Sequence, residues 1–265
     1  MRTMIIAEAA ANHAGKIDIA KNMVRVAAEC GADYIKFQSW QSKNLKQGDP
    51  NYERHKKSEL SDKDHHVLLE ECKKHKIKFL TTCFDIGRVD FLSKLGIDTI
   101  KVPSTEIGSL RMLRELRERF DHVIVSTGAA LAGEIREAAE ILRSGKFTFL
   151  HCVSIYPTPL DKVNLKRMIW LRQFTPSVGF SDHSLGTEAS KLAIALGANF
   201  IEKHFTINKT LPGKDQAMSS APDVIKEIAD YAKEVERLMG EETYELYPEE
   251  MEVRKQYIGK WGDNK

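Results

Sequence analysis

Cysteine and long apolar runs are scarce in this chain of 265 residues, and each scarcity excludes some classes of protein. The 4 cysteines include no CxxC pair, which predicts reduced thiols rather than a disulfide framework. No run of about 18 apolar residues is present, so no ordinary transmembrane helix is expected. The N-terminus reaches Glu8 too early for a secretory signal. We therefore expect a cytoplasmic protein with no membrane partner.

An excess of charge of either sign is also lacking. Lys plus Arg number 40 and Asp plus Glu 38, which gives a formal net charge of +2. This balance provides no strong field for nucleic acid or an anionic membrane. Two basic runs, at 53–57 and 72–76, contain few aromatics. We interpret them as solvent-exposed faces rather than as a nucleic-acid site.

The clearest pattern that is present is an alternation of short apolar runs with longer amphipathic ones. The short runs are rich in Val, Ile and Phe, which is typical of parallel strands buried on both faces. We predict strands over residues 4–8, 34–38, 77–82, 99–102, 122–126, 147–152, 177–181 and 199–204.

The stretches between these runs predict helices. Apolar residues recur with helical spacing in residues 17–30. Ser61 and Asp64 form a capping-box pattern, and Pro222 suits the first turn of a helix. The predicted helices cover residues 17–30, 61–75, 86–95, 108–118, 131–144, 161–172, 185–197 and 222–239.

The predicted strands and helices alternate in eight β-then-α units. This is the pattern of a closed (β/α)8 TIM barrel, an α/β fold of about 250 residues. We therefore predict a single domain, with the barrel over residues 1–245 and a short C-terminal tail over 246–265. The main alternative is a doubly wound open sheet. That fold usually has fewer strands and a nucleotide-binding loop, and neither GxGxxG nor GxxxxGKS/T occurs in the sequence.

Polar residues follow the apolar runs at the ends of the predicted strands, where barrel enzymes place their active sites. His183 and His204 end the last two strands, which are neighbours in a closed barrel. With Asp182 and Glu202 nearby, two neutral imidazoles suit a divalent transition metal such as Mn, Fe, Co or Zn. Alternatively, each histidine is a hydrogen-bonded structural residue.

A second set of polar residues at the strand ends predicts an anion site. Lys36 and Lys101 each end a buried strand, where an unpaired ammonium is costly and a bound phosphate or carboxylate would compensate. Alternatively, each lysine pairs with an acid such as Glu8 or Glu106. These two carboxylates are also candidates for proton transfer or for positioning water. Hydroxyl donors at the same ends are Ser104, Ser126, Thr127, Ser154 and Ser181.

Segments at these same strand ends resemble motifs of the sialic acid synthase family, the phosphoenolpyruvate-dependent synthases of N-acetylneuraminate and related nonulosonates. The resemblance extends from about residue 4 to residue 240, and several ordered motifs are more specific than any single one. The segments are 5–15, 31–38, 79–85, 101–106, 126–128, 150–157, 179–186 and 201–206.

The resemblance implies a TIM-barrel transferase that condenses phosphoenolpyruvate with an N-acylated hexosamine, such as N-acetylmannosamine or a diacetamido sugar. The product is a sialic-acid-like nonulosonate for the cell surface, and phosphate is released. The resemblance assigns a divalent metal, Mn²⁺ before Mg²⁺ or Co²⁺, to His183 and His204, and catalysis to Glu8 and Glu106. It assigns substrate binding to Lys36, Gln38, Thr82, Lys101, Ser104, Ser126, Ser154, Tyr156, Ser181 and Asp215.

Family members commonly carry a small C-terminal domain, resembling antifreeze proteins, that lends an arginine to the partner subunit's sugar site. This sequence predicts the catalytic barrel alone, so the arginine is replaced, supplied in trans by a separate domain, or unnecessary. The resemblance also implies a homodimer. Two other functions remain open. One is a synthase or lyase that uses phosphoenolpyruvate with a different, for example phosphorylated, sugar aldehyde, with Lys43, Lys46 and Arg54 as candidate contacts. The other is a non-catalytic sugar-binding barrel.

Overall fold

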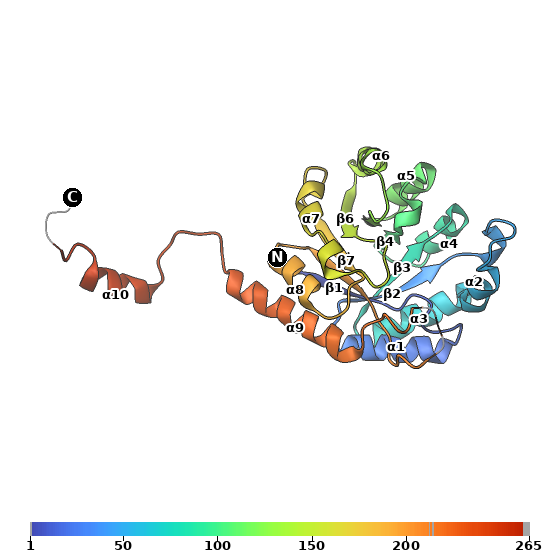
Figure 1. Cartoon of the computed structure of the whole chain (residues 1–265), viewed down its shortest axis with the longest axis horizontal. Helices are drawn as coiled ribbons and strands as arrows, with labels where there is room; N and C mark the ends of the chain where they lie inside the picture. Colours follow the sequence, from blue (N-terminus) through green and yellow to red (C-terminus); the bar gives the residue numbers. More distant parts are fainter. Residues whose placement is uncertain (1, 212, 214, 262–265) are drawn as a thin grey trace.

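Eight parallel strands close into a barrel in the computed structural model, which describes residues 2–211, 213 and 215–261 (Figure 1). Each strand pairs with the next along the chain, and the last pairs with the first, so the predicted TIM barrel is confirmed. The strands are β1 (Met4–Glu8), β2 (Tyr34–Ser39), β3 (Lys78–Cys83), β4 (Thr99–Val102), β5 (His122–Ser126), β6 (Lys146–Cys152), β7 (Val178–Asp182) and β8 (Phe200–His204). The predicted strand ends differ from these by at most one residue.

Helices surround the barrel and cover its outer face (Figure 1). The predicted capping box is present, because the Ser61 hydroxyl accepts from the backbone N–H of Asp64 at 3.1 Å. Pro222 begins its helix as predicted. The helices are α1 (Ile17–Glu29), α2 (Tyr52–Ser58), α3 (Asp62–Lys74), α4 (Val89–Ser93), α5 (Leu110–Arg119), α6 (Ala132–Leu142), α7 (Lys166–Leu171), α8 (Glu188–Ala195), α9 (Pro222–Met239) and α10 (Pro248–Tyr257).

Two of these helices are not predicted by the sequence pattern. The helix α2 follows β2 in an excursion that also contains the 3-10 turn η1 (Ser42–Asn44). The helix α10 lies in the predicted tail, and none of its side chains is buried. Both lack the continuous apolar stripe that identifies a helix packed on a core.

The interior of the barrel has two layers that differ in polarity. The lower layer is an apolar plug, and the upper layer, toward the carboxyl ends of the same strands, is polar. Period-two alternation along each strand places both sets on the inward face. The plug consists of Ile6, Tyr34, Leu80, Ile124, Leu150 and Phe200. The upper layer includes Glu8, Lys36, Thr82, Lys101, Ser126, Ser181 and Glu202, all of them buried.

A larger apolar core lies between the strands and the helices, and it includes Phe37, Phe149 and Ile225. Full burial of such side chains contributes about 1.5–3 kcal/mol each. This core fixes the strands and leaves their carboxyl ends to carry polar groups.

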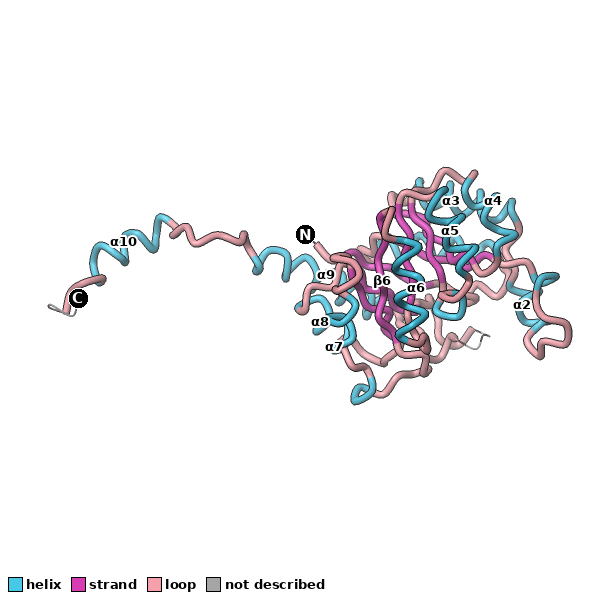
Figure 2. Tube along the Cα trace, turned by 90° about the horizontal axis from the view of Figure 1, so that it is seen from above, coloured by secondary structure: helices cyan, strands magenta, loops and turns pink. Residues whose placement is uncertain are grey.

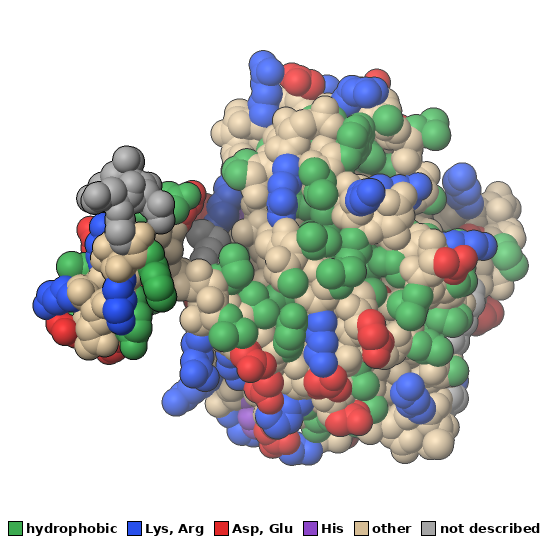
Figure 3. Space-filling view, turned by 60° about the vertical axis from the view of Figure 1, so that its left-hand side comes forward, with side chains coloured by type: hydrophobic (Ala, Val, Ile, Leu, Met, Phe, Trp, Pro, Cys, Tyr) green, Lys and Arg blue, Asp and Glu red, His purple; other side chains and the backbone are tan. Residues whose placement is uncertain are grey.

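The chain leaves the barrel after α9 and continues as an arm that contains α10 (Figures 1 and 2). Its side chains are exposed, including Tyr244 and Tyr247. In the space-filling view hydrophobic side chains are spread over the barrel face that is turned to the viewer (Figure 3). The predicted boundary at residue 246 falls within this arm, and residues 262–265 lie outside the described residues. Among the described helices, none combines the length and apolar character that a membrane span requires.

Candidate active site

A cavity of about 820 Å³ opens above the polar layer, at the carboxyl ends of the strands. Its wall brings together every residue that the family resemblance assigns to the site except Glu106. These residues are Glu8, Lys36, Gln38, Thr82, Lys101, Ser104, Ser126, Ser154, Tyr156, Ser181, His183, His204 and Asp215. Their individual roles stay predictions, but their common location follows from the strand ends that carry them. The predicted hydroxyl donor Thr127 instead donates to the carbonyl of Leu150.

One side of the cavity floor is a buried cluster of one ammonium and two carboxylates. The Nζ atom of Lys36 lies 2.9 Å from Glu8 Oε2 and 3.4 Å from Glu202 Oε2. It also donates to Thr82 Oγ1 at 2.9 Å, and Gln38 Nε2 donates to Glu8 Oε1 at 3.1 Å. The pairing of β1 with both β2 and β8 brings these side chains together.

The pKa values of the two carboxylates in this cluster are shifted in opposite directions. Burial and the charge of Glu202 raise the pKa of Glu8 to about 7. Burial also disfavours the charged form of Glu202, but the charges of Lys101 and Lys36 outweigh it and lower that pKa to about 2. The negative charges of Glu202 and Glu8 likewise outweigh burial at Lys36 and raise its pKa. Near neutral pH, Glu8 can therefore both accept and give a proton.

The other side of the floor holds an ammonium that, within the described part of the chain, forms no ion pair with a carboxylate. Lys101 Nζ donates to Ser126 Oγ at 2.6 Å and to the carbonyl of Val102 at 3.0 Å. Burial, assisted by the charge of Lys36, lowers the pKa of Lys101 to about 8. An unpaired buried cation gains most from a bound anion. The predicted anion site is thus geometrically supported at Lys101, whereas Lys36 has the alternative, paired arrangement.

A small cradle beside Lys101 follows β5. The Ser104 hydroxyl accepts from the backbone N–H of Gly128 at 3.1 Å and lies 3.3 Å from Cys152 Sγ. A Cβ atom at Gly128 would lie 2.5 Å from Ser154 Oγ and 2.6 Å from Cys152 Sγ. Glycine therefore keeps this wall open for a close ligand.

The two predicted metal ligands face one another across the cavity wall. The ring centroids of His183 and His204 lie 5.6 Å apart, with 58° between the ring planes. His183 Nδ1 lies 2.9 Å from the carbonyl of Val153, which fixes the ring and leaves Nε2, 3.5 Å from Ser181 Oγ, toward the cavity. His204 Nδ1 is buried and has no hydrogen-bond partner among the residues that the structure describes.

Both imidazoles are neutral in this environment, as metal ligation requires. Burial and the neighbouring His183 lower the pKa of His204 to about 3. Burial also lowers the pKa of His183. Within the described residues, no set of three or more His, Cys, Asp or Glu side chains is arranged as a metal site. Two histidines alone leave the other coordination positions of a cation to water or substrate.

Asp182, expected beside the histidines, instead lies on the outer face of β7. Its Oδ2 lies 2.7 Å from Lys203 Nζ, and both side chains are buried. The same carboxylate accepts from the hydroxyls of Ser184 and Ser190. Because Asp182 and Lys203 alternate with the inward residues of β7 and β8, their ion pair ties these two strands together behind the histidines.

Glu106 is the predicted catalytic residue that the structure does not bring to the cavity. It ends the 3-10 turn η3 (Ser104–Glu106), and its Oε2 accepts from the hydroxyl of Ser109 at 2.6 Å. The tight turn directs Ser104 to the cavity wall and Glu106 toward the start of α5. Among the described residues Glu106 forms no ion pair with Lys101, so that alternative is wrong. The catalytic role of Glu106 stays a prediction.

Other cavity residues are absent from the sequence-based assignment. In that assignment Glu202 is only an acid near the histidines. Period-two alternation along β8 places it on the inward face that His204 also occupies, and it lines the cavity. The basic run at 53–57 is interpreted as solvent-exposed, and only Arg54 is named, as a candidate contact of a phosphorylated acceptor. Arg54 and Lys57 are exposed, and together with His55 they also line the cavity. No local pattern identifies them, because α2 reaches the cavity only through long-range contacts.

The barrel and its cavity define the class of this protein: a TIM-barrel enzyme with a polar site at the carboxyl ends of its strands. Comparison with known proteins then identifies the family. The chain belongs to the NeuB family, whose model matches residues 23–244. The predicted membership in the sialic acid synthase family is confirmed.

Individual relatives extend over most of the chain. The N,N'-diacetyllegionaminic acid synthase of Campylobacter jejuni is 39% identical and covers 91% of this chain and 78% of its own. The N-acetylneuraminate-9-phosphate synthase of Homo sapiens is 31% identical, and the match covers 93% of this chain and 74% of that protein. The crystal structure of N-acetylneuraminic acid synthetase from Leptospira borgpetersenii, in complex with citrate, matches with a TM-score of 0.90 and 32% identity over 98% of this chain and 94% of that one.

Proposed function

We propose that this enzyme condenses phosphoenolpyruvate with the open-chain aldehyde of an N-acylated hexosamine, giving a nonulosonate and phosphate. The names of the relatives support this class of reaction, since they are synthases of legionaminic and neuraminic acids. The observation that carries the proposal is Lys101, a buried ammonium that donates to the Ser126 hydroxyl and forms no ion pair with a carboxylate among the described residues. Such a group suits a multiply charged anion like phosphoenolpyruvate.

Phosphoenolpyruvate would bind on the floor, beside Lys101. The hydroxyls of Ser126, Ser104 and Ser154 surround the cradle at Gly128 and offer donors to its phosphate and carboxylate. Holding this anion beside the acceptor converts a bimolecular reaction into an effectively unimolecular one. The acceptor would occupy the outer part of the cavity, where Gln38, Tyr156 and Asp215 lie in the wall.

The reaction forms a carbon–carbon bond between C3 of phosphoenolpyruvate and the aldehyde carbon. The aldehyde oxygen takes up a proton, and the positive charge that develops at C2 is met by water. The resulting tetrahedral carbon expels phosphate by cleavage of its C–O bond. Glu8 would orient this water and accept its proton, because its pKa of about 7 lies near the working pH.

A divalent metal, Mn²⁺ before Mg²⁺ or Co²⁺, fits the pair His183 and His204. The anchored Nδ1 of His183 and the unpartnered Nδ1 of His204 support this assignment. When bound, such a metal acts as a Lewis acid toward a carbonyl oxygen. The side chains themselves would hold the cation at the acceptor end, and Ser181, which donates to Glu202 at 2.8 Å, would keep Glu202 in place.

Phosphate release from phosphoenolpyruvate tests the proposal directly. The assay supplies Mn²⁺ with N-acetylmannosamine or with a 2,4-diacetamido-trideoxyhexose, and the nonulosonate is measured separately. The substitution His183→Ala distinguishes a synthase from a sugar-binding barrel. We expect it to abolish turnover, whereas a binding module would lose little. Absence of phosphate release with every acceptor of this class would contradict the proposal.

A further inference from the structure

The helix α2 presents cations to the mouth of the cavity that no described acid neutralises. Arg54 and Lys57 line the cavity from this helix, together with His55. Both are exposed, and in the described part of the chain neither belongs to an ion pair. The two unpaired cations thus lie at the mouth of a cavity rather than on an open surface.

The backbone of α2 is held in place from below. Trp40 directly follows β2, and its Nε1 donates to the carbonyl of His55 at 3.1 Å. The ring centroids of Trp40 and His55 lie 5.4 Å apart in an edge-to-face contact. Gly15 has φ of +73°, and a Cβ atom there would lie 2.1 Å from the carbonyl oxygen of Lys57. The turn after β1 therefore admits α2 only because this residue is glycine.

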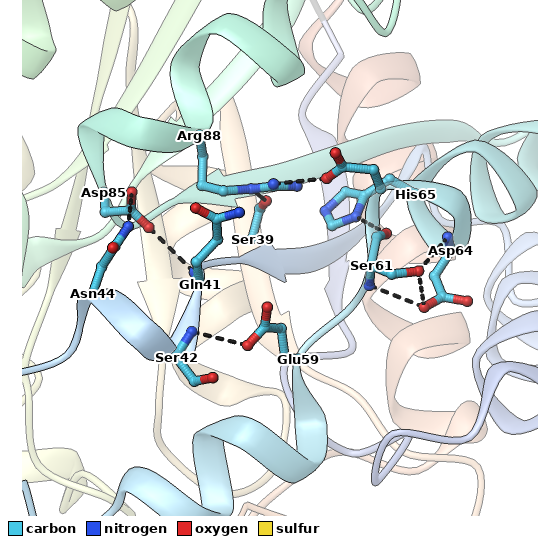
Figure 4. Close-up of polar contacts among 11 residues, drawn as sticks. Ser39, Gln41, Ser42, Asn44, Glu59, Ser61, Asp64, His65, Asp85 and Arg88 are labelled. Atoms are coloured by element: carbon cyan, nitrogen blue, oxygen red, sulfur yellow. Dashed lines mark hydrogen bonds and ion pairs between the residues drawn. The ribbon is translucent and has the colours of Figure 1, made fainter.

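The two ends of the excursion that carries α2 are tied to each other and to the barrel (Figure 4). The Glu59 carboxylate accepts from the backbone N–H of Ser42 at 2.9 Å, which joins the two ends. Asp85, which follows β3, accepts from the backbone N–H of Gln41 at 3.3 Å and from Asn44 Nδ2 at 3.1 Å. The helix is thus anchored before any ligand arrives, and a preorganised site has less ordering entropy to lose on binding.

The charges in the cavity are divided unevenly between floor and mouth. On the floor, Lys36 is shared by two carboxylates. At the mouth, Asp215 lines the wall from the segment between β8 and α9, and its charge acts on Tyr156. We propose that Arg54 and Lys57 form a second anion-binding subsite at the mouth of the cavity, which receives a phosphate group of a substrate and is distinct from the anion site at Lys101 on the floor.

This subsite rests on the proposed function for its substrates, and its ligand chemistry has two sources. One is phosphoenolpyruvate itself on its way to the floor. The other is a phosphate ester at the end of the sugar acceptor remote from the aldehyde. In both cases the guanidinium of Arg54 offers two parallel donors, and Lys57 adds a second charge.

The experiment compares the double substitution Arg54→Gln and Lys57→Gln with the control Lys56→Gln. Lys56 lies on the same helix, 6.0 Å from the ring of Tyr52, and does not line the cavity. The kcat and KM values are measured for phosphoenolpyruvate, N-acetylmannosamine and its 6-phosphate. We expect a KM increase of about tenfold or more for one phosphate-bearing substrate, an unchanged kcat, and no change in the control. An increase for phosphoenolpyruvate with either acceptor assigns the subsite to substrate entry; an increase for the 6-phosphate alone assigns it to the acceptor.

Calorimetric titration with inorganic phosphate separates this subsite from the proposed reaction, because it needs no turnover. We expect two binding sites in the unmodified protein and in Lys56→Gln, and one in the double variant. A protein that binds phosphate in this way but releases none from phosphoenolpyruvate would contradict the proposed function and support the subsite. A single phosphate site in all three proteins would overturn the subsite. The kinetic results would also overturn it if the control and the double variant had equal effects, or if the double variant lowered kcat and left the KM values unchanged.

Discussion

The two buried lysines of the cavity floor occupy equivalent places on their strands but have opposite electrostatic surroundings. Lys36, on β2, lies between Glu8 of β1 and Glu202 of β8. Lys101, on β4, has Ser126 of the next strand and a backbone carbonyl instead. As a result, the pKa of Lys36 is raised and that of Lys101 is lowered to about 8.

This difference divides the floor by function. A cation paired with two carboxylates gains little from a further anion. Lys101 forms no ion pair with a described carboxylate, and Glu202 and Glu8 act on it only through longer-range charge, so a bound anion compensates it more. The Lys36 side is therefore suited to handling protons, with Glu8 near its titration point. The Lys101 side is suited to holding phosphoenolpyruvate.

The largest expected effect is that of Glu8→Gln on the proton-handling side. The amide keeps the size of the side chain and its place beside Gln38, but it accepts no proton. We expect kcat to fall by about 10²–10⁴-fold, the usual contribution of a positioned acid or base. The calorimetric affinity for phosphoenolpyruvate should change little. A loss confined to that affinity, with kcat retained, would reverse the proposed division.

Removal of the unpaired charge by Lys101→Met is expected to have the next largest effect. The methionine fills a similar volume without the ammonium, so phosphoenolpyruvate loses its main counter-charge. We expect kcat/KM for phosphoenolpyruvate to fall by about 10²–10³-fold, comparable with the loss of one donor from a preorganised anion site. The matched control is Lys203→Met, which removes a buried lysine outside the cavity. Comparable weakening of phosphoenolpyruvate binding in both variants would contradict the assignment.

The sequence predicts the strands and the common location of the site because both depend on local patterns. Residues such as Lys36 and Lys101 end short apolar runs, and strand ends of a closed barrel meet at one rim. The sequence does not distinguish the two lysines, because their partners come from neighbouring strands. Once the barrel order is known, the distinction follows, since β2 lies beside β1 with its Glu8, whereas β4 lies beside β5 with its Ser126.

The features of the site that the sequence does not show have the same physical origin. The position of Glu106 depends on a 3-10 turn whose geometry no periodic pattern reveals. The place of α2 depends on contacts with residues distant in sequence, including Trp40 and Asp85. A run of charges by itself predicts solvent exposure, and only the tertiary anchors bring Arg54 to the cavity.

The pH dependence of kcat/KM tests both halves of the floor together. Glu8 must be a carboxylate, which requires a pH above its raised pKa of about 7. Lys101 must be an ammonium, which requires a pH below its lowered pKa of about 8. We therefore expect a narrow maximum between these values and a fall of about tenfold per pH unit on either side. In Glu8→Gln the acidic limb should disappear and the basic limb should remain. A flat profile from about pH 6 to pH 9 would exclude this pairing of roles.

The smallest expected effect is that of Ser126→Ala, which sharpens the contrast between the lysines. The Ser126 hydroxyl accepts a hydrogen bond from the charged form of Lys101 at 2.6 Å, so its loss disfavours that form. We expect the pKa of Lys101 to fall further and the basic limb of the pH profile to move to lower pH. The affinity for phosphoenolpyruvate should weaken by about three- to tenfold, the usual worth of one hydrogen bond. Ser109→Ala, which removes a hydroxyl outside the cavity, is the control and should leave both quantities unchanged. A basic limb that stays in place in Ser126→Ala would mean that a group other than Lys101 titrates there.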